Sequence, residues 1–446
     1  MTKWVMLTDF ALVGALLLLG KILRVHCRPL QRIYMPVAVL AGMVGLILGP
    51  SSVDILPWGR DFASNASLLT AVLFAALGLA TDLPSPRCVA QRAGSLWAFN
   101  QVATVSQWLF AAMLGLFLAT FFWPGLNPGF GLILSAGFMG GHGTAVVVGN
   151  IFSDLGWADA LTLGLTFATA GIFISISVGM LILQLAVKLG VIRNFTCFNR
   201  MDDYQRKGLI APDKQQAVLK ETLSALSVDS FAIHIALIAV VTAFAYHSAN
   251  YLSSFSEQIQ IPNFVTAFIG GMMVRLVAQK TGCRRYLCDN VFNHAGATTT
   301  DFLIVFGISS IKVMVLASYL LPMLILLVSG TLFTLFLVLW VAPRMLGEEW
   351  FEKGIFSWGW LTGTVAMGIA LLRIIDPRMN GGVLDDYAIA YVPGSITDVF
   401  IISMMPLAMV HGFYMEAVMA SAVYLLLVLF VWKVFLCRSQ GQPVME

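Results

Sequence analysis

The sequence predicts an all-α polytopic membrane protein with two inverted-topology repeats of five transmembrane helices, a re-entrant hairpin in each repeat, and one extra C-terminal helix. Three observations support this fold class. The chain is 59% hydrophobic and only 11% charged. Apolar runs long enough to cross a bilayer recur from end to end, and nearly all basic residues fall on one predicted side of the membrane. This composition leaves no room for a sizeable soluble domain.

The transmembrane helices are predicted from apolar runs of about 17 residues or more. In the first half these runs cover residues 4–20, 34–50, 66–81, 96–122 and 160–186. In the second half they cover 229–250, 262–279, 302–342 and 387–411. The run 302–342 is too long for one crossing at ~1.5 Å per residue, so we expect it to form two helices with a turn at Lys312. The run 415–436 is the extra helix.

The first re-entrant hairpin is predicted near 129–149, because this segment has seven glycines in 21 residues and no ionisable side chain except His142. Its centre, Gly140–Thr144, would be a poor helix interior, since each Gly costs ~1 kcal/mol relative to Ala. Broken backbone is tolerated at membrane depth only where protein buries it or a watery cavity bathes it. We therefore predict that the tip of this hairpin faces a binding cavity. The second hairpin is predicted near 355–371.

The distribution of basic residues sets the predicted orientation. If both hairpins return to the side they entered and the N-terminus is outside, all Lys and Arg residues except Lys3, Arg60 and Lys312 fall on the inner side. The six cysteines also fall there, where a reducing cytoplasm keeps thiols unpaired. We therefore expect no structural disulfide and a cytoplasmic C-terminus.

Five crossings are an odd number, so the second half is expected to enter the membrane from the opposite face. The predicted domains are 1–187 for the first repeat, 188–228 for a cytoplasmic linker, 229–411 for the second repeat, and 412–446 for the extra helix and tail. Two local matches support the repeats. The pattern Ile33-x-x-Pro36-x4-Ala41-x3-Gly45 recurs as Ile259-x-x-Pro262-x4-Ala267-x3-Gly271, and Gly143-Thr144 recurs as Gly363-Thr364.

Several of these residues resemble the bacterial sodium/glutamate symporters. The resemblance rests on the GGHGT motif at 140–144, the preceding Ser135, the segment ending in Ala168-Thr169-Ala170-Gly171, the helix after Pro262, and the second Gly/Thr-rich segment. It extends from Ile33 to about Val410, and GGHGT is its one specific motif. It implies a secondary transporter of the bacterial inner membrane, a homodimer that imports glutamate with sodium and has neither enzymatic activity nor a cofactor.

The second hairpin departs from the pattern of that family. The family has a Gly-Ala-Thr-Pro-Thr type of core followed by Asn, whereas this chain reads GWLTGTVAMG at 359–368, without the Pro and the Asn. The chain therefore resembles a divergent member, for which transport is a firmer expectation than glutamate.

The residues themselves also indicate how such a protein would bind a solute. Half-helix N-termini at two broken hairpins attract carboxylates, while unwound carbonyls and Thr hydroxyls coordinate sodium. For a small anionic substrate we predict contacts from Ser135, Gly140, Gly141, His142, Gly143, Thr144, Gly363, Thr364 and Arg373. For sodium we predict Thr144, Asn150, Thr169, Thr364 and Asp398.

Some of these residues have a second interpretation. His142 either takes part in proton coupling or is a neutral side chain bonded to the hairpin backbone. Asp398 is either a sodium ligand or the ion-pair partner of Arg373, which could also extend to the membrane interface. Asn150 and Ser135 either line the cavity or cap helix ends.

Other functional classes fit the sequence less well. GGHGT lacks the Lys and the spacing of a nucleotide-binding P-loop, and Ser135 or Thr144 beside His142 has no further carboxylate to complete a hydrolase site. His142 alone does not make a metal site, and nothing points to nucleic acid. A channel with a re-entrant selectivity filter remains an alternative, as does a sodium- or proton-coupled transporter of dicarboxylates or other organic anions.

Overall fold

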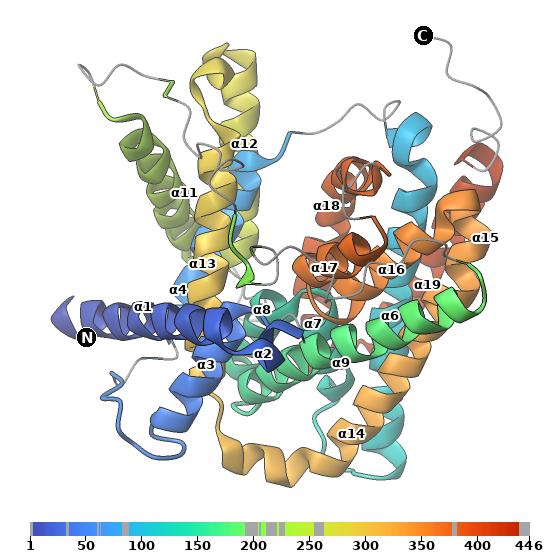
Figure 1. The fold of residues 1–446 in the computed structure, drawn as a ribbon, viewed down its shortest axis with the longest axis horizontal. Coiled ribbons are helices and arrows are strands. Elements are labelled where there is room, and N and C mark those ends of the chain that lie inside the picture. The colour runs from blue at the N-terminus through green and yellow to red at the C-terminus, as the bar shows by residue number, and fades with distance from the viewer. Residues whose placement is uncertain are drawn as a thin grey trace. The chain divides into compact units, whose positions relative to one another are not determined.

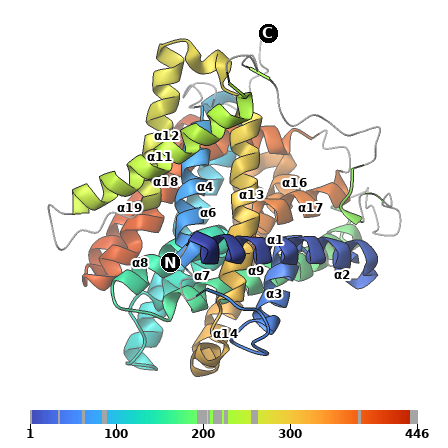
Figure 2. The ribbon, with the colours of Figure 1, turned by 90° about the vertical axis from the view of Figure 1, so that its left-hand side faces the viewer.

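The computed structural model contains helices and no strands in the part of the chain that it describes. The described residues are 3–32, 35–59, 62, 64–82, 89–191, 204, 207–210, 221–222, 228–253, 263–376 and 381–436. The chain divides into two compact units, and each unit combines segments from both halves of the sequence. Figures 1 and 2 show the helices of both units in two orientations.

Unit 1 covers residues 1–31, 35–82 and 202–310. Its helices are α1 (Lys3–His26), continuing into the short α2 (Arg28–Arg32), α3 (Val37–Leu48), α4 (Ser64–Ala80), α11 (Ser230–Ser253), α12 (Asn263–Lys280) and α13 (Asp289–Ser309). α4 packs against both α12 and α13, and Figures 1 and 2 both show α4 beside α13. Small residues allow this close packing, because a Cβ on Gly78 would lie 2.4 Å from the carbonyl oxygen of Phe268.

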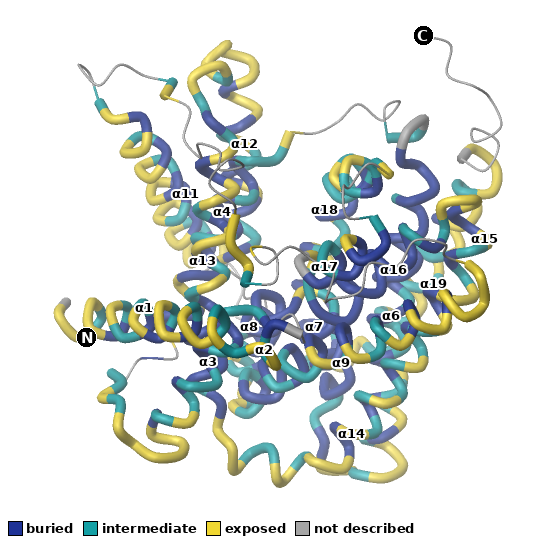
Figure 3. Tube along the Cα trace, in the orientation of Figure 1, coloured by how far each residue is buried: buried dark blue, intermediate teal, exposed yellow. Residues whose placement is uncertain are grey.

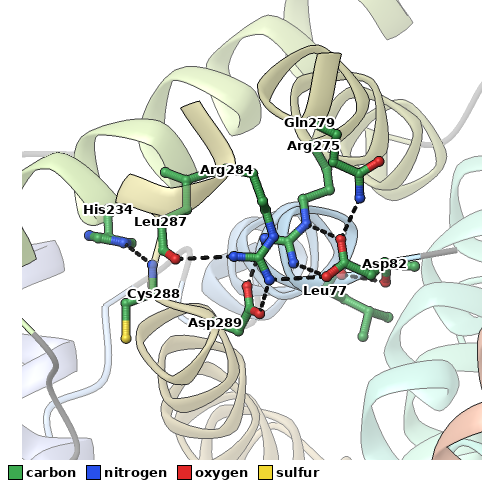
Figure 4. Close-up of polar contacts among 10 residues, drawn as sticks. Leu77, Asp82, His234, Arg275, Gln279, Arg284, Leu287, Cys288 and Asp289 are labelled. Atoms are coloured by element: carbon green, nitrogen blue, oxygen red, sulfur yellow. Dashed lines mark hydrogen bonds and ion pairs between the residues drawn. The ribbon is translucent and has the colours of Figure 1, made fainter. Parts of the chain in front are cut away.

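A charged cluster joins three helices at one end of unit 1 (Figure 4). Arg275 of α12 is only 1% exposed, and its guanidinium forms ion pairs at 2.5 Å with Asp82, just beyond α4, and at 2.7 Å with Asp289, the first residue of α13. Arg284 bonds to the same two carboxylates. The two carboxylates therefore balance the two guanidinium charges where α4, α12 and α13 meet.

Unit 2 covers residues 32–34, 83–201 and 311–446. Its first part has a short π-helical turn (Val89–Ala93), α6 (Gly94–Phe121), α7 (Phe130–Met139), α8 (Gly141–Asp154) and α9 (Ala160–Lys188). Its second part has α14 (Val313–Phe336), a π-helical turn (Leu337–Val341), α15 (Ala342–Leu346), α16 (Trp350–Thr362), α17 (Val365–Ile375), α18 (Val383–Val410) and α19 (Tyr414–Val431), which continues as a π-helical turn (Trp432–Leu436). α7, α8 and α16 are largely buried (Figure 3).

Seven stretches of the described chain are long and apolar enough to cross a membrane. They are Trp4–His26, Gly94–Phe121, Ala160–Lys188, Ser230–Leu252, Val313–Thr362, Val383–Val410 and Tyr414–Phe435. Helices also lie at the predicted spans 34–50, 66–81 and 262–279, as α3, α4 and α12. The prediction of an all-helical protein with many apolar helices is thus confirmed, whereas the inverted repeats stay a prediction.

One predicted boundary is wrong. The helix expected to start at Phe302 begins at Asp289, because the polar residues between these positions interrupt the apolar run without interrupting the helix. The turn predicted at Lys312 is confirmed, since α13 ends at Ser309 and Lys312 is the N-cap of α14.

Some predictions concern residues outside the described part of the chain. These are Ile33, Ile259 and Pro262 of the repeat pattern, most of the linker 188–228, and Cys88, Cys197 and Cys437. The remaining three cysteines, Cys27, Cys283 and Cys288, are free thiols.

Candidate functional site

Two helical hairpins of unit 2 contain the broken segments that the glycines predict. In the first hairpin, α7 ends at Met139 and α8 begins at Gly141. The two helices run back along each other, because a Cβ on Gly129 at the start of α7 would lie 2.1 Å from Cζ of Phe152 near the end of α8. The break has the left-handed backbone conformation at Gly141, whose φ is +56°. Glycine adopts this conformation without the clash that a Cβ causes.

The second hairpin consists of α16 and α17, with the break at Gly363 and Thr364. Its two helices also pack closely, since a Cβ on Gly359 would lie 2.2 Å from Cα of Gly368. Thr364 has an extended backbone and precedes the first residue of α17. The Pro and Asn that the chain lacks in this hairpin are therefore not needed to break the helix.

The tips of the two hairpins lie against each other. A Cβ on Gly141 would be 3.0 Å from Cγ2 of Thr364 and 3.2 Å from the carbonyl oxygen of Gly363. The GGHGT motif and the Gly363-Thr364 break, more than 200 residues apart in the sequence, thus form one structural feature. A larger side chain at position 141 would push the second tip away.

His142 lies at the start of α8 and is 1% exposed. Its Nε2 is 3.1 Å from the hydroxyl oxygen of Thr169 on α9, and that hydroxyl donates its hydrogen to the carbonyl of Leu165 at 2.9 Å. Because the Thr169 hydroxyl has one hydrogen, it accepts from His142, and Nε2 therefore carries the proton. Nδ1 is then an acceptor, and it is buried without a partner. The bond runs to α9 and not to the hairpin backbone.

α9 contacts both hairpins. A Cβ on Gly171 would lie 2.3 Å from the carbonyl oxygen of Thr362, next to the second break. Four residues further along α9, Ser175 donates to the carbonyl of Gly359 at 3.3 Å, and Trp358 Nε1 donates to the carbonyl of Ser175 at 2.8 Å. α9 therefore contacts both hairpins directly, and at the first hairpin it adds the hydrogen bond between Thr169 and His142.

Gln107 of α6 also connects the two hairpins, and the sequence did not identify it. Its side-chain amide donates to the carbonyl of Leu361 at 3.1 Å and to the hydroxyl of Thr334 at 2.8 Å. Its backbone carbonyl accepts from Ser135 of the first hairpin at 3.0 Å. The sequence offered one signal, an amide side chain within an apolar helix. In membranes such a side chain commonly forms a hydrogen bond to another helix.

The helix ends at the two tips create a defined electrostatic pattern. The N-termini of α8 and α17 lie there, and neither is capped by a side-chain hydrogen bond. Their first-turn N–H groups and positive dipole ends favour an anion. The C-terminal ends of α7 and α16 lie at the same breaks, and their carbonyl oxygens favour a cation.

The other predicted residues of the first hairpin lie close to its tip. Gly140 and Gly143 flank the break, and the Thr144 hydroxyl occupies the space that a Cβ on Gly140 would take, at 1.5 Å. Asn150 lies further along α8 and is partly buried. Ser135 is fully buried, and its hydroxyl is engaged by α6.

Arg373 and Asp398 are not brought to the tips by any contact of the described residues. Arg373 is exposed in the last turn of α17, nine residues after Thr364 and so about 13 Å along the axis. Asp398 lies in α18, which packs against α8. Its Oδ1 is buried without a hydrogen-bond partner, and the ion pairs of the described residues do not join it to Arg373.

Comparison with known proteins identifies a family. Residues 4–369 match the family model described as sodium/glutamate symporter, which is most of the chain and includes both tips. Arg373, Asp398 and α19 lie beyond the matched residues. No curated protein matches the chain.

Proposed function

Since the chain belongs to the sodium/glutamate symporter family, we propose that it imports glutamate, or a closely related small carboxylate, by alternating access. The family makes the protein a multi-pass membrane transporter that uses sodium as its coupling ion. Our proposal goes beyond family membership in three respects: the identity of the substrate, the place where it binds and the way the protein moves.

The meeting of two uncapped helix N-termini at the hairpin tips carries the substrate proposal. α8 begins at Gly141 and α17 at Val365, and Gly141 lies against Thr364. Free N–H groups at such ends bind carboxylates, and two ends on opposite sides of one position bind them better than one. We therefore assign the carboxylates of the substrate to Gly140–Thr144 and to Gly363 and Thr364, which are among the residues predicted from sequence.

The same breaks supply oxygen atoms for sodium. Carbonyl groups at the ends of α7 and α16 and the hydroxyls of Thr144, Thr169 and Thr364 are ligands of the hard, oxygen-binding kind. Asp398 is a candidate for a separate sodium position, supported by its buried, unpartnered Oδ1. Asn150 remains a candidate along α8.

The state of His142 favours an amino acid over a simple dicarboxylate. Because Nε2–H donates its hydrogen bond to Thr169, Nδ1 is a hydrogen-bond acceptor, and it has no donor among the described residues. The ammonium group of glutamate is such a donor, and an unpaired buried acceptor costs about 1–3 kcal/mol when nothing fills it. A dicarboxylate without an amino group has no hydrogen to give. Proton coupling through His142 is the less supported alternative.

Two observations support inverted repeats and alternating access. The helix order α1, α3, α4, α6, α7–α8, α9 has the same pattern as α11, α12, α13, α14, α16–α17, α18. The first three helices of each series belong to unit 1, and the rest to unit 2. We propose that unit 1 is the scaffold and unit 2 the transport body, so that the repeats 1–187 and 229–411 each contribute to both.

The setting of the protein follows from its basic residues. We propose a bacterial inner membrane with the N-terminus outside, since this orientation puts all but three Lys and Arg residues inside. We also propose a homodimer, as the family resemblance implies.

Uptake of radiolabelled L-glutamate into proteoliposomes tests the proposal. We expect uptake with an inward sodium gradient, little uptake without it, and weak competition by glutarate, which lacks the amino group. Absence of sodium-dependent uptake by folded protein would reject glutamate. Competition by glutarate as strong as by glutamate would favour the dicarboxylate alternative, and sodium flux that needs no substrate would favour a channel.

A further inference from the structure

One helix of unit 1, α13, has a solvent-exposed face that is polar. The exposed residues of α13 are Asn290, Asn293, His294, Ala297, Thr298 and Asp301. Their spacing of three and four residues places all of them on one side of the helix. The opposite side is buried and includes Phe292, Gly296 and Leu303. We call the exposed set the polar stripe of α13.

The polar stripe extends to membrane depth. α13 has 21 residues, so its length of about 31 Å matches the ~30 Å thickness of a hydrocarbon core. Its first residue, Asp289, belongs to the charged cluster with Arg275, and Lys312 follows its other end. Asp301 is therefore about 18 Å along the helix from the charged end, near the middle of the crossing.

The middle parts of α11 and α12, by contrast, have apolar exposed faces. α11 exposes Val240 by 66% and Phe244 by 63%, and α12 exposes Ile269 by 50% and Met273 by 59%. Such faces suit contact with lipid chains. The polar stripe of α13 does not suit contact with lipid, because lipid offers no hydrogen-bond partner to its two Asn, one His, one Thr and one Asp. Accordingly α13, although long enough, is not among the helices that are apolar enough to cross on composition.

We propose that the polar stripe of α13 lines a water-filled path that leads small hydrophilic solutes into the membrane-spanning part of the protein. Water satisfies the amides, the imidazole and the carboxylate that lipid would leave unpaired. The proposal does not depend on which solute the hairpin tips bind, because it concerns only the solvent at the stripe.

Cysteine labelling in proteoliposomes tests the path. Asn293→Cys and Thr298→Cys report on the stripe, and Ile269→Cys is the matched control on the apolar face of α12. A charged, membrane-impermeant maleimide is applied without glutamate or sodium gradient, and modification is read at each peptide by mass spectrometry, so the native cysteines can stay in place. We expect both stripe variants to react at least about tenfold faster than the control, since the nucleophile that attacks the maleimide is the thiolate, which forms in water.

A second measurement uses the unmodified protein. Hydroxyl-radical footprinting in nanodiscs is expected to oxidise His294 and to spare Phe244, which is exposed on α11. If the two stripe cysteines in folded protein react no faster than Ile269→Cys, or if His294 is protected as well as Phe244, then lipid or another protein surface covers the stripe and the proposal is wrong. Glutamate uptake is not part of either readout, so failure of the proposed function would leave both tests intact.

Discussion

The Nε2 nitrogen of His142 lies 3.1 Å from the hydroxyl oxygen of Thr169 and donates a hydrogen bond to it, since that hydroxyl gives its own hydrogen to the carbonyl of Leu165. This bond ties the tip of the first hairpin to α9, the helix that also holds the second hairpin through Gly171 and Ser175. The orientation of the imidazole, and with it the direction in which Nδ1 presents its lone pair, therefore depends on this hydroxyl group.

Thr169→Val is expected to disturb this arrangement with little change in side-chain shape. It leaves Nε2–H of His142 buried and unpaired, which costs about 1–3 kcal/mol. We expect a lower thermal unfolding temperature in detergent and a higher KM for glutamate uptake. Thr169→Ser keeps the hydroxyl and is expected to retain the wild-type KM. A Val variant with the stability and KM of the Ser variant would show that the bond to His142 does not position the tip.

Gln107→Leu is expected to loosen the two hairpins together. The substitution removes the hydrogen bonds to Leu361 and Thr334 while keeping a side chain of similar size. Losing partners of buried carbonyl and hydroxyl groups costs about 1–3 kcal/mol. We expect faster hydrogen exchange in both α7–α8 and α16–α17, measured by mass spectrometry. Ser106→Ala is the control, because among the residues that the structure describes the Ser106 hydroxyl bonds to carbonyls of its own helix, those of Val102 and Ala103. If the increase in hydrogen exchange were confined to α6, Gln107 would not connect the two hairpins.

The charged cluster predicts a loss of stability in acid. Hydrogen bonds from Arg275, with a further contribution from Arg284, lower the pKa of Asp82 to about 2 from its ordinary 3.8. A carboxylate with a lowered pKa stabilises the folded state above its unfolded pKa, and this contribution disappears as the pH falls towards the folded pKa. We expect the unfolding temperature to fall between pH 4 and pH 2.

Asp82→Asn should remove this part of the acid sensitivity, with a lower unfolding temperature at pH 7 and a flatter profile below pH 4. Because Asp82 is 45% exposed, solvent screens the pair and the change is expected to be modest. Asp54→Asn, at an exposed residue outside the cluster, provides the comparison. Equal profiles for wild type and Asp82→Asn would rule out Asp82 as the titrating group.

Much of the fold could be predicted because apolar run length sets helix position in a membrane protein. The breaks at Gly140 and Gly363 were predictable for the same local reason, since glycine-rich segments are poor helix interiors. The start of α13 could not be predicted in this way, because its polar stripe interrupts the apolar run from which helix positions were inferred. Hydropathy follows the polarity of the residues along a helix, and the exposed face of α13 from Asn290 to Asp301 is polar.

The sequence identified many residues of the candidate site, but it did not show which of them contact one another. GGHGT and Gly363-Thr364 were identified from the backbone freedom of glycine, yet their contact depends on packing across more than 200 residues of sequence. Gln107 could not be assigned, since its partners Thr334 and Leu361 lie far along the chain. The bond from His142 to Thr169 was likewise beyond local reasoning, which left open a role in proton coupling and a bond to the hairpin backbone.

Binding of L-glutamate to the purified protein, measured by calorimetry in sodium and in choline, tests most directly whether the two tips form the substrate site. Gly141→Val places a branched side chain where a Cβ would already lie 3.0 Å from Thr364. Gly156→Ala is the control, because Gly156 also has a positive φ, +97°, but nothing within 4 Å of its Cβ position. We expect sodium-dependent binding by the wild type and by Gly156→Ala, and none by Gly141→Val that elutes as folded protein. Wild-type affinity in folded Gly141→Val would contradict a site at the tips.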